Sequence, residues 1–468
     1  MGEPAASGRW RAIAIVTVAL ALIASLLPIV PAPVAADAAV GEFSSARAWS
    51  HLEHIAAEPH PLPSPAHARV HAYLVRTLRD LAIQTEEWDI ERELGDHRLR
   101  LRNILARVPG SDPARKAVLL VAHHDSAPRA PGAGDDGAAV AALLETLRAL
   151  AASPPLAADV LALFTDGEER GLLGAQACAG DARLASVGVV LNFEARGNRG
   201  ASLMFETSTP NRGLIDAFAQ AAPCPTGSSL MGDVYRRMPN DTDFTIFREH
   251  GFRGLNFAFI GGYDAYHQPW DSVANLAASS LQHHGAQMLA LARRFATHEL
   301  QGGDPLDAVY FNLGPLFVHY PATLVWPLTI GAVALLLVVL VRSRAALAWR
   351  PLLAAMIELL GALVLTTIVG FGVSQALLAL VPGSVRQLVW GHTRHDGPLL
   401  VLLALVALML AGGLLRSASR RIGVACLFAA ALCVWVLALV AASCWLPGGS
   451  YLFLWPIVPV LIAACTTS

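Results

Sequence analysis

Short apolar runs alternate with helix-like segments between residues 40 and 300. The apolar runs lie at 117–122, 160–165, 187–193 and 255–260. Segments with helical periodicity include 66–82, 137–152 and 279–298. Strands that alternate with helices indicate an α/β domain, with a mostly parallel sheet flanked by helices. We expect this domain to span residues 40–305.

A long uncharged run near the start of the chain predicts a membrane anchor. Residues 12–30 carry no charge and follow Arg9 and Arg11. The run is long enough for a spanning helix of about 20 residues. Small residues after it would also suit cleavage of a signal peptide, but the run exceeds a typical signal core. Residues 1–39 are therefore expected to be an anchor or a signal, with the anchor favoured, and either one exports the α/β domain.

Long apolar runs return near the end of the chain and predict an all-α transmembrane bundle over residues 306–468. Five runs lie at 322–341, 352–380, 398–415, 422–446 and 451–465. The last run is the shortest, so it is expected to be a short or partial span. With the N-terminal run, six spans are expected, which makes this a multi-pass protein of the lipid bilayer.

Arginine positions predict the orientation of the spans. Arginines cluster at 342–350 and at 416–421, and Arg9 and Arg11 precede the first run. Because loops rich in Lys and Arg stay in the cytoplasm, all three segments are expected there. The α/β domain would then be extracytoplasmic. The preference for Arg over Lys, with abundant Ala, Gly and Pro, is typical of a GC-rich genome and favours a bacterial protein. The membrane would then be a bacterial inner membrane, with the domain on its periplasmic side.

Composition agrees with a membrane protein and argues against a nucleic-acid partner. Apolar residues make up 54% of the chain and charged residues only 15%, against about 25% charged in soluble domains. The net charge is −2, whereas nucleic-acid binding calls for a basic patch. The six cysteines form no metal-binding pattern.

Residues able to bind a metal follow each of the four predicted strands. They are His123 and Asp125, Glu168 and Glu169, Glu194, and His267. Ligands of open α/β sheets bind outside the carboxyl ends of the strands. The sequence therefore predicts one site assembled from four strand ends.

The segment AHHDS places His123 and Asp125 two residues apart. In an extended chain both would point to the same face, and the carboxylate could fix the imidazole of a metal ligand. His124 would point to the opposite face in a structural role. Alone, such a pair is also typical of an ordinary polar strand end.

Asp135 and Asp136 lie in a Gly-rich turn before a predicted helix. Asp135 could project a carboxylate between two cations, and Asp136 is well placed to cap the helix. Capping is an equally ordinary role for Asp135. The turn alone therefore does not decide between a metal ligand and a cap.

Glu168 and Glu169 are adjacent acids bracketed by Gly167 and Gly171. One could bind metal while the other accepts a proton from a metal-activated water. Adjacent acids near a turn are otherwise solvated surface.

Glu194 closes an apolar strand, where a carboxylate is costly unless it is paired or coordinated. His267 lies beside Tyr266 in a loop rich in Gly and aromatic residues. A histidine there could instead pack on Trp270.

Taken in order, the motifs HxD, GxxDDG, GEERG, NFEARG, PNDTDF and YHxxxDS resemble the co-catalytic zinc exopeptidases, which include secreted bacterial aminopeptidases. The resemblance covers residues 50–300. The Glu of NFEARG, together with VYFNLGPLFVHYP leading to a membrane bundle, looks most like the endoplasmic-reticulum metallopeptidase branch and its bacterial relatives.

The resemblance implies two Zn²⁺ ions and a peptide substrate. It implies one zinc on His123 and Glu194, the other on Glu169 and His267, and Asp135 bridging them. It further implies a metal-bridging hydroxide as nucleophile, with Glu168 as general base, Asp125 orienting His123 and Tyr266 stabilising the oxyanion. His124 and Thr242 depart from the family pattern, where an aromatic residue and a histidine are frequent.

The resemblance leaves several activities open. An aminopeptidase is the expectation, since Asp241 and Asp243 in PNDTDF could hold the substrate amine. Arg196 could instead receive a carboxylate, as in a carboxypeptidase, or form a structural ion pair. A glutaminyl cyclase on the same fold, or a non-catalytic receptor or binding protein, are the remaining alternatives.

Overall fold

The computed structural model describes residues 30–94, 97–300, 306–343, 348–380 and 396–467. The chain divides into two compact units between Tyr320 and Pro321. The predicted first span, 12–30, lies outside the described residues except for its last position.

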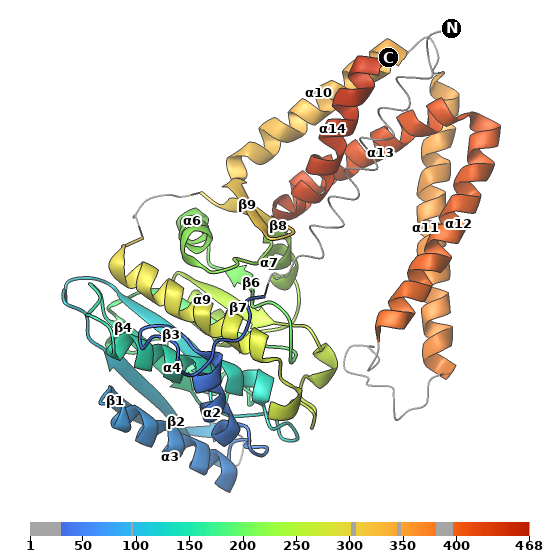
Figure 1. Ribbon diagram of the computed structural model, residues 1–468. Coiled ribbons are helices and arrows are strands. Elements are labelled where there is room, and N and C mark those ends of the chain that lie inside the picture. The colour runs from blue at the N-terminus through green and yellow to red at the C-terminus, as the bar shows by residue number, and fades with distance from the viewer. Residues whose placement is uncertain (1–29, 95–96, 301–305, 344–347, 381–395, 468) are drawn as a thin grey trace. The chain divides into compact units, whose positions relative to one another are not determined.

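The first unit is built on a seven-stranded sheet whose centre is parallel (Figure 1). Its strand order is β1-β2-β4-β3-β5-β7-β6. The four central strands pair in parallel and are the four predicted from the sequence. They are β4 (Val160–Thr165), β3 (Ala117–His123), β5 (Val187–Ala195) and β7 (Gly254–Phe259). The carboxyl ends of these four strands therefore lie at the same end of the sheet, as the predicted α/β fold requires.

The edges of this sheet are antiparallel, so the sheet as a whole is mixed. β1 (Gln84–Leu94) pairs with β2 (His97–Val108), and β2 runs antiparallel to β4. At the other edge, β6 (Leu203–Thr207) runs antiparallel to β7. A separate two-stranded sheet joins β8 (Ala308–Leu313) to β9 (Leu316–Pro321). β8 and all of β9 except Pro321 lie before the division of the chain.

Helices cover both faces of the central strands because alternate residues of each strand point to opposite sides. On β3, Leu120 and Ala122 pack in the cluster that contains α2, α4 and α9, while Leu119 and Val121 pack against α5 and α8. The remaining helices of this unit border the sheet. The bounds are α2 (Ser45–Ile55), α3 (Pro65–Asp80), α4 (Ala139–Ala151), α5 (Leu173–Cys178), α6 (Arg212–Ala221), α7 (Ser229–Tyr235), α8 (Asp243–Glu249) and α9 (Ala278–Thr297).

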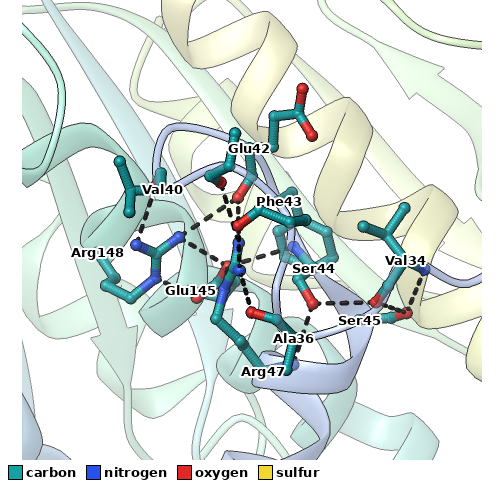
Figure 2. A network of polar contacts seen from close by, with 12 residues as sticks. Val34, Ala36, Val40, Glu42, Phe43, Ser44, Ser45, Arg47, Glu145 and Arg148 are labelled. Atoms are coloured by element: carbon teal, nitrogen blue, oxygen red, sulfur yellow. Dashed lines mark hydrogen bonds and ion pairs between the residues drawn. The ribbon is translucent and has the colours of Figure 1, made fainter.

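A buried carboxylate ties the segment after the predicted anchor to this helical layer (Figure 2). The side chain of Glu145 on α4 is fully buried. It accepts hydrogen bonds from Arg47 Nε at 2.8 Å, from Arg148 Nε at 2.6 Å and from the N–H of Ser44 at 3.2 Å. Two arginines thus offset the desolvation of one carboxylate, which would otherwise be costly.

The second unit consists of apolar helices. Four of them are long and apolar enough to cross a membrane, namely α10 (Val325–Ser343), α11 (Trp349–Leu380), α12 (Asp396–Ile422) and α13 (Val424–Trp445). They coincide with four of the predicted runs. The fifth run forms the shorter apolar helix α14 (Tyr451–Thr467), in keeping with the short or partial span expected there. A hydrogen bond of 2.8 Å between Thr329 and Ser443 joins α10 to α13.

Candidate metal centre

The structure brings three predicted ligands together at the ends of β3 and β5. Nε2 of His123 lies 3.1 Å from Oδ1 of Asp135 and 3.6 Å from Oε2 of Glu194. All three residues are buried. They form one group able to hold a metal ion.

A second group shares Asp135 with the first. Nε2 of His267 lies 3.2 Å from Oδ2 of Asp135 and 3.1 Å from Oε1 of Glu169. Each oxygen of Asp135 therefore faces a different histidine. The shared carboxylate gives the arrangement expected of a residue that bridges two cations.

The spacing of these atoms fits zinc. Ligands at about 2.0 to 2.1 Å from a tetrahedral zinc lie about 3.3 Å from one another, and the observed separations range from 3.1 to 3.6 Å. Oε1 of Glu169 and Nε2 of His267 are buried and have no hydrogen-bond partner among the described residues. Unsatisfied buried atoms of this kind call for a bound ion or an ordered water.

The pKa values in the second group also favour a positive charge at this place. Burial lowers the pKa of His267, yet its contacts with Asp135 and Glu169 outweigh this effect and raise the pKa to about 10. Burial raises the pKa of Asp135, but hydrogen bonds from His123 and His267 bring it below the usual value. The carboxylates thus hold positive charge at the place where a metal would supply it.

The tautomer of His123 is fixed by the backbone. Nδ1 of His123 lies 3.0 Å from the carbonyl oxygen of Asp125. Because a carbonyl only accepts, Nδ1 carries a proton, and Nε2 is the ring nitrogen that would bind a metal. The carboxylate of Asp125 lies farther from Nδ1, at 3.5 Å. Strand β3 ends at His123, and both the carbonyl and the carboxylate of Asp125 lie on the Nδ1 side of the ring.

The carboxylate of Asp125 instead holds the turn that carries the adjacent glutamates. Its two oxygens accept the N–H groups of Glu168 at 3.0 Å and Glu169 at 3.3 Å. Gly167 and Gly171 have φ of +73° and +104°, a conformation that glycine adopts without a steric penalty. Both glycines therefore permit the tight turn that the sequence predicted.

Glu168 stands beside the first group without joining either set of ligands. Its side chain is half-buried. Burial raises its pKa well above the usual value, and the negative charges of Glu194, Asp243 and Glu169 add to the effect. Glu168 is thus a carboxylate with a high proton affinity next to the candidate ligands.

Asp271 supports the loop that presents Asp135, a role that sequence reasoning missed. Its Oδ1 accepts the N–H of Gly134 at 2.7 Å, and its Oδ2 accepts the N–H of Asp135 at 3.2 Å. Burial and the charge of Asp135 raise the pKa of Asp271 to about 7. A Cβ at Gly134 would lie 2.3 Å from the carbonyl oxygen of Gly197, so only glycine fits there. The DS pair in YHxxxDS was the available signal.

Asp136 does not cap the following helix, contrary to the expectation from its position. The helix has no side-chain cap. Oδ2 of Asp136 accepts the N–H of His123 at 3.2 Å instead, because the turn directs this side chain back toward β3.

Tyr266 stacks on His267, with ring centroids 3.8 Å apart and planes 25° from parallel. Nε2 of His267 faces Asp135 and Glu169, and the indole N–H of Trp270 donates to the carbonyl of Asp264 at 2.8 Å. The guanidinium of Arg196 lies over the ring of Tyr266, 5.4 Å from its centroid.

The acidic pair of PNDTDF is divided between two environments. Asp243 begins helix α8, is buried and bonds to Thr165. Asp241 precedes the helix and is exposed. Only Asp241 remains available to a substrate, whereas the sequence suggested a loop that exposes both.

Comparison with known proteins identifies this arrangement. Residues 103–292 match the family model described as peptidase family M28. The match runs from β2 to α9 and contains all members of the two ligand groups. The chain contains a peptidase M28 domain.

Curated relatives of this M28 domain include a metallopeptidase and a membrane protease. Endoplasmic reticulum metallopeptidase 1 of Rattus norvegicus is 30% identical over 310 residues, which cover 60% of this chain and 34% of the relative. A vacuolar membrane protease of Candida albicans is 34% identical over 239 residues, covering 50% and 28%. The chain thus spans about a third of the length of these relatives.

Solved structures similar to the M28 domain include an aminopeptidase from Aneurinibacillus sp. strain AM-1. That structure is 12% identical, has a TM-score of 0.47, and the match covers 56% of this chain and 97% of that one. A glutaminyl cyclase from an Acidobacteriales bacterium is 20% identical with a TM-score of 0.46, and the match covers 57% and 99%.

Proposed function

We propose that this chain is a membrane-anchored, zinc-dependent exopeptidase that removes residues from the amino end of peptides. The observation that carries the proposal is the pair of ligand groups that share Asp135. Two adjacent cation sites joined by one carboxylate are typical of two-metal hydrolases.

In this proposal His123 and Glu194 would hold one zinc, Glu169 and His267 would hold the other, and Asp135 would contribute an oxygen to each. When bound, the two zinc ions would polarise the substrate carbonyl and make a water molecule acidic enough to attack it at neutral pH. Asp125 and Asp271 keep the ligand-bearing turns in place through the backbone N–H groups that they accept.

Glu168 is proposed as the general base and acid. Its carboxylate takes the proton of the attacking water and delivers it to the departing amine. Its high proton affinity suits this role. Its backbone N–H is fixed by Asp125, so the side chain starts from a defined position.

Tyr266 is proposed to donate a hydrogen bond to the oxyanion that forms during attack. Burial and the charge of Asp135 raise the pKa of its phenol, so the hydroxyl keeps its proton at neutral pH. Its stacking on His267 places it next to the second ligand group.

Recognition of the amino end is assigned to Asp241. Exposed Asp241 offers a carboxylate for a protonated amine. Arg196 offers the charge that a carboxypeptidase would need, but its guanidinium lies over Tyr266.

Two modified peptides test this choice. We expect N-terminal acetylation of a short peptide to abolish its cleavage by the detergent-solubilised protein, and C-terminal amidation to leave the rate largely unchanged. The reverse pattern would assign the anchoring role to Arg196 and make the protein a carboxypeptidase.

The membrane setting of the proposal rests on the four apolar helices and on the arginine-rich segments between them. These segments favour a domain outside the cytoplasm, on the periplasmic side of a bacterial inner membrane.

A further inference from the structure

A further buried group of possible metal ligands, two histidines and one aspartate, lies outside the proposed zinc centre. It consists of His67 on α3, His124 directly after β3 and Asp166 directly after β4. Their exposed fractions are 2%, 1% and 0%. Each offers one ligand atom, and these three atoms lie within 4.8 Å of one another. The proposed reaction uses none of them.

His67 and Asp166 are close without being hydrogen-bonded. Nε2 of His67 lies 2.9 Å from Oδ1 of Asp166. Even so, both atoms are buried without a hydrogen-bond partner among the described residues. Buried polar atoms that are left unsatisfied in this way call for a bound ion or an ordered water.

His124 presents a free lone pair to the same place. Its Nδ1 lies 2.7 Å from the carbonyl oxygen of Thr165. Because that oxygen only accepts, Nδ1 is the protonated nitrogen and Nε2 of the neutral ring carries the lone pair. Nε2 is buried and has no hydrogen-bond partner in the described part of the chain. A ring nitrogen fixed by a carbonyl in this way is the usual setting of a metal-binding histidine.

The carboxylate of Asp166 is oriented in the same manner. Its Oδ2 accepts the N–H of Arg102 at 2.7 Å, and its own N–H donates to Asn103 at 3.0 Å. One oxygen thus accepts a backbone N–H, while Oδ1 has no hydrogen-bond partner within the described ranges.

We propose that His67, His124 and Asp166 bind a further divalent cation, zinc, separate from the two of the catalytic centre. Two imidazole nitrogens and one carboxylate oxygen are ligands that zinc accepts.

An ion pair between protonated His67 and Asp166 accounts for fewer of the contacts. It would leave Nε2 of His124, which is buried, without a partner among the described residues. A cation satisfies all three buried atoms at once.

The cation would join α3 to two turns of the catalytic centre. His124 follows the ligand His123, and Asp166 precedes Glu168 by two residues. Binding all three segments to one ion would hold these turns against the helix. The role is structural, because the group is buried and lies apart from the proposed ligands.

Zinc content tests the site. The full chain, purified in detergent, is dialysed against zinc-free buffer, and zinc per chain is measured by mass spectrometry. We expect His67→Leu to hold one zinc fewer than the unchanged protein. His71→Leu is the matched control, since His71 lies one turn along the same helix, is equally buried and has its ring 5.6 Å from that of His124, but belongs to no ligand group among the described residues. Its zinc content should not change.

The comparison does not depend on how many ions the catalytic centre holds, so it separates this site from the proposed function. Equal zinc in the unchanged protein and a folded His67→Leu would overturn the proposal. If His67→Leu does not fold, anomalous scattering at the zinc edge from crystals of the unchanged protein decides instead. A peak between His67, His124 and Asp166 supports the site, and no peak there overturns it.

Discussion

Replacing Asp271 by asparagine tests whether the loop around Asp135 sets the affinity for metal. The carboxylate now accepts two buried N–H groups, from Gly134 and Asp135. Asparagine keeps one acceptor oxygen, but its NH₂ group would face the other N–H, donor against donor. That N–H then loses its partner, which costs about 1 to 3 kcal/mol.

This cost is expected to appear as weaker zinc binding, because Asp135 contacts both histidines. Each 1.4 kcal/mol is a factor of ten in a binding constant, so the dissociation constant should rise about 10- to 100-fold. Changes of this size are typical for residues that orient metal ligands. The assay is competition of the solubilised protein with a chromophoric zinc chelator.

Asp264→Asn is the matched control. It removes the same charge from the same loop, while the contact of Asp264 with the indole of Trp270 uses its backbone carbonyl and survives the substitution. We expect it to leave the zinc affinity unchanged. The reasoning is refuted if Asp271→Asn binds zinc as tightly as the unchanged protein, or if Asp264→Asn weakens binding equally.

Three further predictions concern stability and topology. Glu145→Ala should lower the free energy of unfolding by about 3 kcal/mol, because it leaves Arg47 and Arg148 without their buried partner. Denaturation of the full chain, followed by tryptophan fluorescence, measures this loss, and Glu42→Ala, at an exposed position, should have little effect. Burial, aided by His283, lowers the pKa of His284 to about 3, so between pH 6.5 and pH 3 the unfolded chain binds a proton that the folded chain does not. Stability is therefore lost as the pH falls, by about 2 kcal/mol from pH 7 to pH 5 through this group, and His284→Phe should show a flatter pH dependence; an unchanged slope would contradict this. Reporter fusions at Ser343 and Ser419 should report the cytoplasm, and a signal from the opposite side would move the M28 domain inside.

The central strands could be predicted because a strand that is buried on both faces consists of a continuous run of apolar residues. β4 matches its predicted bounds, 160–165, and the others differ by one or two residues. β1 could not be found in this way, since Gln84–Leu94 is rich in charged residues and lies at the edge of the sheet. An edge strand that faces solvent carries no apolar run to reveal it.

The candidate ligands were accessible to sequence reasoning because strand order brings the carboxyl ends of parallel strands together. The supporting contacts were not. That the side chain of Asp125 holds the glutamate turn while its carbonyl holds His123 depends on where β3 ends. The convergence of His67 with His124 and Asp166 depends on how α3 packs. Neither arrangement can be deduced from the spacing of these residues along the sequence.

Turnover of Glu168→Gln at full zinc occupancy tests the central claim most directly. Glutamine has nearly the shape of glutamate but cannot accept the proton, and general-base catalysis is worth about 10² to 10⁴ in rate. We predict that the variant retains zinc and loses turnover of a short peptide by about that factor. A Glu168→Gln protein that keeps its zinc and cleaves the peptide at nearly the unchanged rate would contradict the account.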